Sequence, residues 1–231
     1  MLKHKEQNNL GVVDNCTIDN FPVIHINRYI YLREPQLTEQ DIENFYQCYN
    51  EPEISRFLPN SVIPKSHYDA KYAIERYRDG FIDKNSCFWF IVDKRKEKMI
   101  GTVGLQSYDR HNSKTELCYE VSKKYARLGI ATSATLCAIN YGFQKLEMNR
   151  IEAMTTTNNK PSVSLLLNAG FKYEGTLKQY RLFKGKYVDV NMFSYIKDKY
   201  EDSEHSQIAN EKLKYYSKKC STLYQTRIDL L

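Results

Sequence analysis

The sequence contains no long hydrophobic run. No apolar stretch in its 231 residues approaches the ~18 residues that a membrane-spanning helix needs. Hydrophobic residues make up 42% of the chain and charged residues 27%, the balance of an ordinary globular domain. The first residues are basic but lack the apolar core and the small-residue cleavage site of a signal peptide. We therefore expect a folded cytoplasmic protein with no membrane partner.

Closely spaced cysteines are also missing. The six cysteines are spread along the chain, with no Cys-x-x-Cys pair and no histidine beside two cysteines. This spacing argues against a zinc motif and against the disulfide framework of a secreted protein. We expect reduced thiols and no metal, and we assign no role to the five isolated histidines.

The excess of positive charge is small. Lys and Arg number 34 and Asp and Glu 28, a net charge of +6, and the charges are dispersed rather than gathered in one stripe. The six charged residues at 93–98 separate two apolar runs, as in a solvated hairpin tip. Nucleic acid is therefore not the expected partner, although docking on RNA or the ribosome stays open as an alternative.

The length fits a single domain with extra segments at its ends. A strand-like run begins at Tyr29, so we expect an N-terminal extension over 1–28 and a domain over 29–197. In the remaining C-terminal extension, 198–231, apolar residues recur at helical spacing and predict a helix.

Strand and helix patterns alternate irregularly along this domain. The predicted strands cover 29–33, 87–92, 99–105, 115–121, 150–156, 171–177 and 188–196. The predicted helices cover 38–51, 66–80, 129–143 and 159–170. This order predicts the α+β (mixed α/β) class, with a mostly antiparallel mixed sheet of about six to seven strands flanked by helices.

Residues 125–132, Tyr-Ala-Arg-Leu-Gly-Ile-Ala-Thr, form a loop between a strand and a strongly apolar helix. The start of a helix presents free N–H groups and the positive end of the helix dipole, which suit a phosphate. Gly129 has no side chain, so a phosphate can approach the backbone closely, and the small side chain of Ala131 does not obstruct it. The chain has no GxxxxGK[ST] and no GxGxxG pattern, so ATP and NAD are not favoured. A glycine at a helix start is ordinary, so this motif needs a second one beside it.

That second motif is N-x-x-S-x(7)-G-F, which runs from Asn159 through Ser162 to Phe171. The loop from Ala126 to Ala131 also fits the pattern (Q/R)-x-x-G-x-(G/A), apart from its first position. Together the two motifs resemble the GNAT N-acetyltransferase superfamily. Five further motifs in the same order are similar to its RimJ/RimL-type branch, whose members acetylate protein N-termini or small amines. They lie at 32–35, 51–53, 115–119, 150–153 and 185–190, and the resemblance spans 29–197.

The resemblance implies a GNAT-like fold in which a splayed pair of strands forms an acetyl-CoA cleft. The strand that ends at Val121 would pair with the pantetheine arm, and Asn159 would hydrogen-bond the cofactor near that arm. Ser162 would lie near the thioester sulfur and donate to the departing thiolate. The backbone N–H groups implied to hold the pyrophosphate are those of Arg127, Leu128, Gly129, Ile130, Ala131 and Thr132.

Acetyl transfer to an amine also needs a base and a proton donor. Glu116 matches the place where several GNAT enzymes carry their base, and we rank it first. Glu120 follows on the same strand face, and Glu152 lies on the strand expected beside it. Besides Ser162, the alternative acids are Tyr119, Tyr173 and Tyr180.

Two positions depart from the family pattern. Ala126 replaces the usual Gln or Arg of the loop, and Arg181 stands where the RimL enzyme has a glutamate. We predict an acetyl-CoA-dependent N-acetyltransferase that acts by direct attack in a ternary complex. Its acceptor would be a protein N-terminal amine or a small-molecule amine, bound between the helices at 38–77 and the hairpin at 179–189. The alternative is a non-catalytic acyl-CoA-binding or RNA/ribosome-associated protein, and a homodimer stays open.

Overall fold

A computed structural model describes residues 20–197 and 202–228, with side chains in the last helix described for 210–227. In this part of the chain, eight strands form one sheet in the order β1-β2-β3-β4-β5-β6-β8-β7. The strands are β1 (Ile24–His25), β2 (Ile30–Arg33), β3 (Cys87–Asp93), β4 (Lys98–Asp109), β5 (Lys114–Val121), β6 (Arg150–Thr156), β7 (Lys172–Phe183) and β8 (Lys186–Ile196). Only β5 and β6 pair in parallel among these strands, so the predicted mixed, mostly antiparallel sheet is confirmed.

Two details of the sheet differ from the sequence prediction. The strand that the sequence did not predict is β1, which lies within the segment 1–28 that we named an N-terminal extension. It has two residues, too few to show an alternating pattern. The β7–β8 hairpin is longer than predicted because β7 continues to Phe183. Most residues of that continuation are exposed, so no hydrophobic alternation marked it in the sequence.

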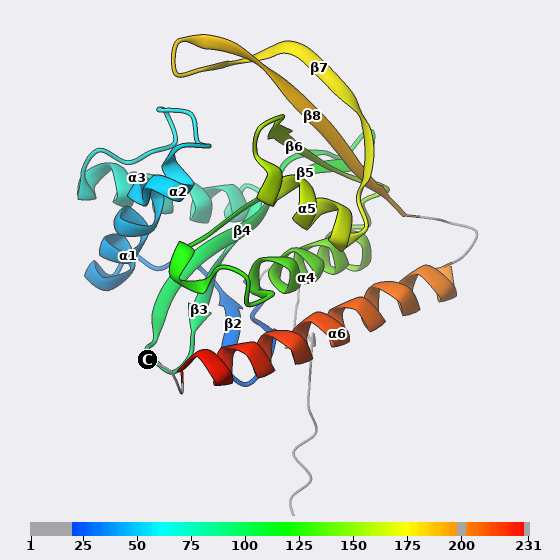
Figure 1. Ribbon diagram of the computed structural model, residues 1–231, viewed down its shortest axis with the longest axis horizontal. Helices are drawn as coiled ribbons and strands as arrows, with labels where there is room; N and C mark the ends of the chain where they lie inside the picture. Colours follow the sequence, from blue (N-terminus) through cyan, green and yellow to red (C-terminus); the bar gives the residue numbers. More distant parts are fainter. Residues whose placement is uncertain (1–19, 198–201, 229–231) are drawn as a thin grey trace, which may run out of the picture.

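Helices cover both faces of the sheet (Figure 1). On one face lie α1 (Glu39–Asn50), α2 (Pro52–Ser55) and α3 (His67–Ile82), and on the other α4 (Ile130–Gln144), α5 (Lys160–Ala169) and α6 (Asp202–Ile228). A 3-10 turn, η1 (Lys123–Tyr125), precedes α4. The alternation of β3 explains this layering, because Phe90 packs in the cluster of α1 and α3 while Trp89 packs in that of α4.

Three of these helices begin at the residues that their sequences indicate. The Thr38 side chain accepts a hydrogen bond from the backbone N–H of Asp41, and Ser66 caps α3 in the same way. Asn159 caps α5, which ends at Gly170 in the left-handed conformation, with φ of +109°. Local side-chain chemistry therefore sets where these helices begin.

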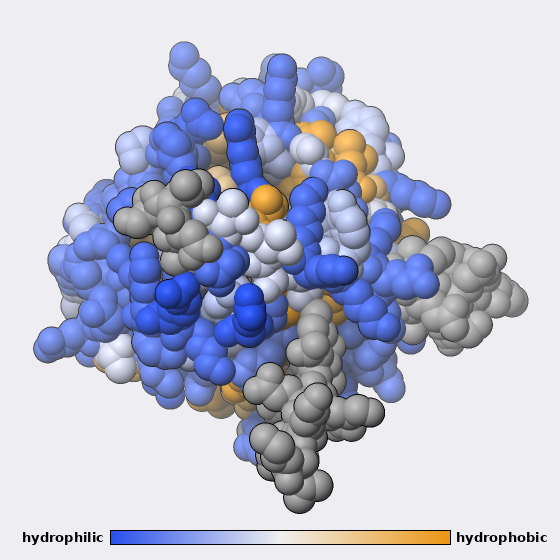
Figure 2. All heavy atoms as spheres, turned by 60° about the horizontal axis from the view of Figure 1, so that its bottom comes forward, coloured by the Kyte–Doolittle hydropathy of each residue, from blue (hydrophilic) through white to orange (hydrophobic). Residues whose placement is uncertain are grey.

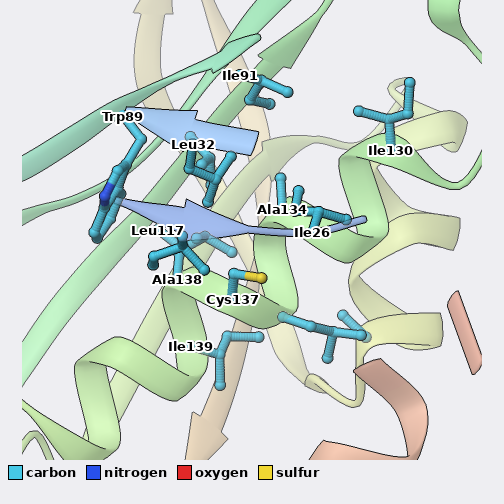
Figure 3. Packing of buried hydrophobic residues seen from close by; sticks show 14 of the residues in the cluster. Ile26, Leu32, Trp89, Ile91, Leu117, Ile130, Ala134, Cys137, Ala138 and Ile139 are labelled. Atoms are coloured by element: carbon cyan, nitrogen blue, oxygen red, sulfur yellow. The ribbon is translucent and has the colours of Figure 1, made fainter. Parts of the chain in front are cut away.

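The main core lies between the sheet and α4 (Figure 3). Ala134 and Ala138 on α4 are fully buried, which brings the helix close to the strands. Trp89 meets the ring of Tyr141 edge-on, with ring centroids 5.1 Å apart, and its indole N–H donates to the carbonyl of Pro22 at 2.8 Å. The segment before β2 is thus part of the core, because Pro22 supplies the acceptor for a buried indole.

The helix in the C-terminal segment packs on α4 and adds Leu213, Cys220 and Tyr224 to the same core. In Figure 1, α6 runs along the lower side of α4. The hydroxyl of Ser217 donates to the carbonyl of Ile26. Contacts with α4 and with the segment before β2 therefore fix α6 against the domain.

The charged run at 93–98 is a hairpin tip, as predicted, because Asp93 pairs with Lys98 across β3 and β4. Asp93 itself is an exception to the expected solvation, since it is fully buried. On the face shown in Figure 2, hydrophilic residues predominate and hydrophobic ones form small patches. None of the helices that the structure describes is long and apolar enough to cross a membrane.

Candidate active site

A cleft opens where β5 and β6 diverge. Their parallel pairing covers 114–116 of β5 and 150–152 of β6 and extends no further. Beyond this point β5 still pairs with β4 as far as Val121, and β6 pairs with β8 as far as Thr156. The inner edges of the two strands are therefore available to an added extended chain, as the resemblance implied.

Segments from both faces of the sheet line this cleft. They are the helices α1 to α3, the strands β5 and β6, the loop at 125–132, the first turns of α5, and Arg181 and Phe183 from β7. Lys184, at the tip of the β7–β8 hairpin, donates to the carbonyl of Ser55 at 3.0 Å. The hairpin and the α1–α3 helices thus meet across the cleft, where we expected the acceptor to bind.

The loop at 126–132 contributes to the lining of the cleft. Leu128 and Ile130 are buried, and their side chains anchor the loop in the core. Arg127 and Gly129 have left-handed backbones, with φ of +63° and +79°. Gly129 is the N-cap of α4 and supplies no capping side chain, so the first N–H groups of α4 are left for a ligand. This arrangement fits a phosphate group.

Nearly all the predicted site residues line the cleft. Glu116, Val121, Asn159 and Ser162 do so, together with the loop residues Arg127, Gly129, Ile130, Ala131 and Thr132. Leu128 contributes its side chain to the core instead, while its backbone remains in the loop. Of the alternative acids, Tyr119 lines the cleft, whereas Tyr173 and Tyr180 are more than half exposed and lie elsewhere.

Side chains of β5 point alternately to the two sides of the sheet. Glu116, Cys118 and Glu120 face α1 and α3, where Glu120 meets Tyr49. Tyr119 faces α5, where it meets Ser162. Carboxylates and the phenol of one short strand are therefore presented on opposite sides of the cleft.

Glu120 belongs to a cluster of hydroxyl groups. Its Oε2 atom accepts hydrogen bonds from Thr102 Oγ1 at 3.0 Å and from the Tyr49 hydroxyl at 3.2 Å. The Tyr49 hydroxyl lies 2.9 Å from that of Tyr77. Burial of the carboxyl raises the pKa of Glu120 to about 7, although the two hydrogen bonds oppose that rise. The carboxylate and its conjugate acid are thus both populated near neutral pH.

The other two carboxylates are held differently. Glu116 accepts a hydrogen bond from the side-chain amide of Gln106 at 3.0 Å. Glu152 receives Arg150 Nε at 2.7 Å and lies 3.9 Å from Lys114 Nζ. Glu116 and Glu120 line the cleft, whereas Glu152 does not and is held by its two cationic neighbours instead.

On the opposite side, the Tyr119 hydroxyl lies 2.8 Å from Ser162 Oγ. Asn159, which also lines the cleft, accepts a hydrogen bond at its Oδ1 atom from the backbone N–H of Ser162 at 3.3 Å. Burial raises the pKa of Tyr119, so the phenol keeps its proton at physiological pH. Tyr119 and Ser162 together can donate a proton to a group in the cleft.

Sequence reasoning missed the partners of Glu120. Tyr49 lies within the helix predicted over 38–51, and Thr102 within the strand predicted over 99–105. They lie 71 and 18 residues from Glu120 along the chain, so no local spacing links them. Only the pairing of β4 with β5 and the packing of α1 bring the three together.

Residues 30–172 match the family model described as an acetyltransferase (GNAT) domain. The chain belongs to the GNAT acetyltransferase family. It is accordingly an acyltransferase, and the expected GNAT-like fold is confirmed. The uncharacterized N-acetyltransferase YoaA of Bacillus subtilis (strain 168) is 32% identical over 177 residues, which cover 77% of this chain and 98% of YoaA.

Solved structures of other GNAT proteins share this fold. The microcin C7 self-immunity acetyltransferase MccE, in complex with acetyl-CoA and AMP, is 22% identical with a TM-score of 0.67, covering 75% of this chain and 96% of MccE. RimL, a ribosomal L7/L12 α-N-protein acetyltransferase in complex with coenzyme A, is 16% identical with a TM-score of 0.68, covering 75% of this chain and 97% of RimL. The expected co-substrate is thus a ligand of known proteins with this fold.

No metal site emerges in the part of the GNAT chain that the structure describes. There, no group of three or more His, Cys, Asp or Glu residues is placed to hold an ion. No disulfide links any two of the described cysteines, Cys48, Cys87, Cys118, Cys137 and Cys220, while Cys16 lies outside the described residues.

Proposed function

We propose that this GNAT protein transfers the acetyl group of acetyl-CoA to a primary amine by direct attack in a ternary complex. The observation that carries the proposal is the arrangement across β5. A carboxyl with a pKa of about 7, that of Glu120, lies on the side of α1 and α3. A phenol–hydroxyl pair, Tyr119 and Ser162, lies on the side of α5. Amine acetylation needs a proton acceptor for the amine and a proton donor for the departing thiolate.

The acyl donor would bind through the loop and the diverging strands. The first N–H groups of α4 would hold the pyrophosphate, and the open edge of β5 near Val121 would pair with the pantetheine amides. The Asn159 side-chain amide would donate to the same arm. Bound acetyl-CoA supplies an activated thioester, and these contacts orient it.

The proton of the amine would pass to a carboxylate on β5. The sequence pointed to Glu116, and this assignment stays a prediction. Glu120 has the stronger case, because its pKa of about 7 lets it accept a proton near neutral pH. Both carboxylates share one strand face and would also attract an acceptor that arrives as an ammonium ion.

The departing thiolate would take a proton from Tyr119 or Ser162. Their hydroxyl groups lie 2.8 Å apart, so one can donate to the sulfur while the other stabilises it by a hydrogen bond. The acceptor itself would be a protein N-terminal amine or a small-molecule amine. A cytoplasmic location and a homodimer remain further proposals.

The test is acetyl-CoA turnover, read as release of free thiol, against N-terminal peptides, polyamines and aminoglycosides. We expect turnover on at least one acceptor, and we expect E120Q and S162A each to reduce kcat about 10²-fold or more, on the scale of lost acid–base groups. Comparing kcat of E116Q with that of E120Q shows which of the two carboxylates contributes more to turnover. E211Q, an exposed position on α6, is the matched control and should leave turnover unchanged. Binding of CoA without turnover on any acceptor, with intact folding, would contradict the proposal.

A further inference from the structure

The helix α6 runs directly behind the loop that is proposed to hold the pyrophosphate. A methyl group added to Gly129 would lie 3.7 Å from the carbonyl oxygen of Tyr216 and 3.8 Å from Cys220 Cβ. Cys220 and Tyr224 are fully buried at this contact. The C-terminal half of α6 is therefore packed against the loop, although it lies beyond the residues that match the family model.

A single buried carboxylate ties the end of α6 to the start of the loop. Asp93 Oδ2 accepts from the Tyr224 hydroxyl at 2.5 Å and from the Tyr125 hydroxyl at 3.0 Å. Tyr224 is on the last turns of α6, and Tyr125 immediately precedes Ala126. Since both phenols share one acceptor atom, the helix end and the loop hold a fixed relation to each other.

Arg227 follows Tyr224 by almost one helical turn and lies over the loop. Its Nη1 atom donates to the carbonyl of Ala126 at 3.1 Å, and its side chain is exposed and lines the cleft beside Arg127. Within 20–197 and 210–227, no carboxylate forms an ion pair with this guanidinium. A guanidinium has five N–H donors, so most of them remain for a ligand.

Apart from Arg127, nearby residues of the loop end of the cleft supply little free positive charge beside the Arg227 guanidinium. Ala126, at the start of the loop, has no polar side chain. Lys123, another cation that lines this end of the cleft, is paired with Glu53. A phosphate at the start of α4 would therefore meet backbone N–H groups, with Arg227 and the loop residue Arg127 as the nearby cations. Guanidinium and phosphate match in geometry and form charge-assisted pairs.

We infer that Arg227 binds a phosphate group of the acyl-CoA substrate, so that α6 completes the cofactor site from outside the matched family domain. This inference rests on the proposed function. The hydrogen bond to Ala126 orients the guanidinium, and the hydrogen bond from Tyr224 to Asp93 holds α6 in place. The ligand group is either the diphosphate or the 3′-phosphate of coenzyme A.

The experiment measures the dissociation constants of CoA and 3′-dephospho-CoA by titration calorimetry. The proteins are the full-length chain and its R227A, R227K and R227Q variants, with K214A, an exposed lysine on the same helix, as the matched control. We expect R227A and R227Q to weaken CoA binding about 10-fold, the scale of a charge-assisted hydrogen bond. R227K should recover part of the affinity, and K214A should bind as the wild type does. The KM for acetyl-CoA should rise in R227A while kcat at saturation is kept.

The two ligands identify the phosphate. If the 3′-phosphate is bound, R227A and wild type bind dephospho-CoA equally; if the diphosphate is bound, the loss persists with both ligands. Equal CoA affinity of R227A and wild type would overturn the inference, as would R227Q with full affinity, because the neutral side chain would then suffice. A wild-type protein that binds no CoA would instead refute the proposed function itself, and thermal unfolding confirms that each variant is folded.

Discussion

At the scale of single residues, the environment of Glu120 decides its chemistry. A carboxyl in water titrates well below neutral pH, whereas burial raises the pKa of Glu120 to about 7. Two hydroxyl groups that donate to it favour the charged form and oppose the effect of burial. The balance gives a group that can both accept and release a proton near pH 7.

This balance predicts a pH profile. In the proposed mechanism the carboxylate form of Glu120 is the base, so kcat/KM should rise as the pH increases through about 7 and should level off above the pKa of this group. T102V removes a donor that stabilises the carboxylate and should therefore move this limb to higher pH. The measurement is kcat/KM from pH 5.5 to 9 with one acceptor.

In E120Q, the rise of kcat/KM near pH 7 should disappear. Any pH dependence of kcat/KM that comes from ionisation of the amine acceptor should remain. E97Q, on the exposed β3–β4 turn, is a control that should keep the wild-type profile. A wild-type limb that survives in E120Q and disappears in E116Q would assign the base to Glu116 instead.

At the scale of elements, the turn into α4 depends on a backbone shape that only glycine adopts without strain. Gly129 has φ of +79°, and a methyl group there would meet no atom closer than 3.7 Å. An alanine at this position is therefore opposed by the left-handed backbone and not by crowding. The same shape recurs at Gly185 in the β7–β8 turn, with φ of +81° and nothing within 4 Å.

These two glycines form a matched pair for an experiment. G129A and G185A should each lower the free energy of unfolding by about 1 kcal/mol, the cost of a left-handed alanine. Only G129A should also raise the KM for acetyl-CoA, because it disturbs the N–H groups at the start of α4. Urea unfolding and steady-state kinetics measure the two effects. Equal KM changes in both variants would show that the loop backbone is not the binding element.

At the scale of the whole molecule, the C-terminal helix is part of the folded domain. Its buried residues Cys220 and Tyr224 join the core formed by the sheet and α4. The Tyr224 hydroxyl also satisfies part of a buried carboxylate, Asp93, at a distance of 2.5 Å. Desolvation and the adjacent carboxylate raise the pKa of Tyr224, so this phenol remains a donor across the physiological range.

Y224F should therefore destabilise the whole domain. It removes one hydrogen bond to a buried charge, which costs about 1.5–3 kcal/mol, while Tyr125 still donates to the same oxygen. Y215F, an exposed tyrosine on the same helix, is the control and should change stability by less than about 0.5 kcal/mol. Chemical denaturation compares the two. If Y224F is as stable as Y215F, α6 does not share the stability of the domain.

The order of the elements and the course of the loop were accessible from the sequence. Helix starts at Thr38, Ser66 and Asn159 follow from side chains that cap the adjacent backbone, and such contacts need only three residues. The period-two pattern likewise located the strands. It missed β1 and shortened β7, because two residues show no period and an exposed edge strand has no apolar face.

By itself, the sequence determined the family, the loop that is proposed to hold the pyrophosphate, and the strand that presents Glu116, Tyr119 and Glu120, because local spacing fixes which residues share a face. Only the tertiary structure decided how these groups act. The pKa of Glu120 depends on burial and on hydroxyl groups from α1 and β4, and Tyr119 meets Ser162 only because α5 packs beside β5. Arg227 reaches the loop from 101 residues away, through contacts that no sequence pattern records.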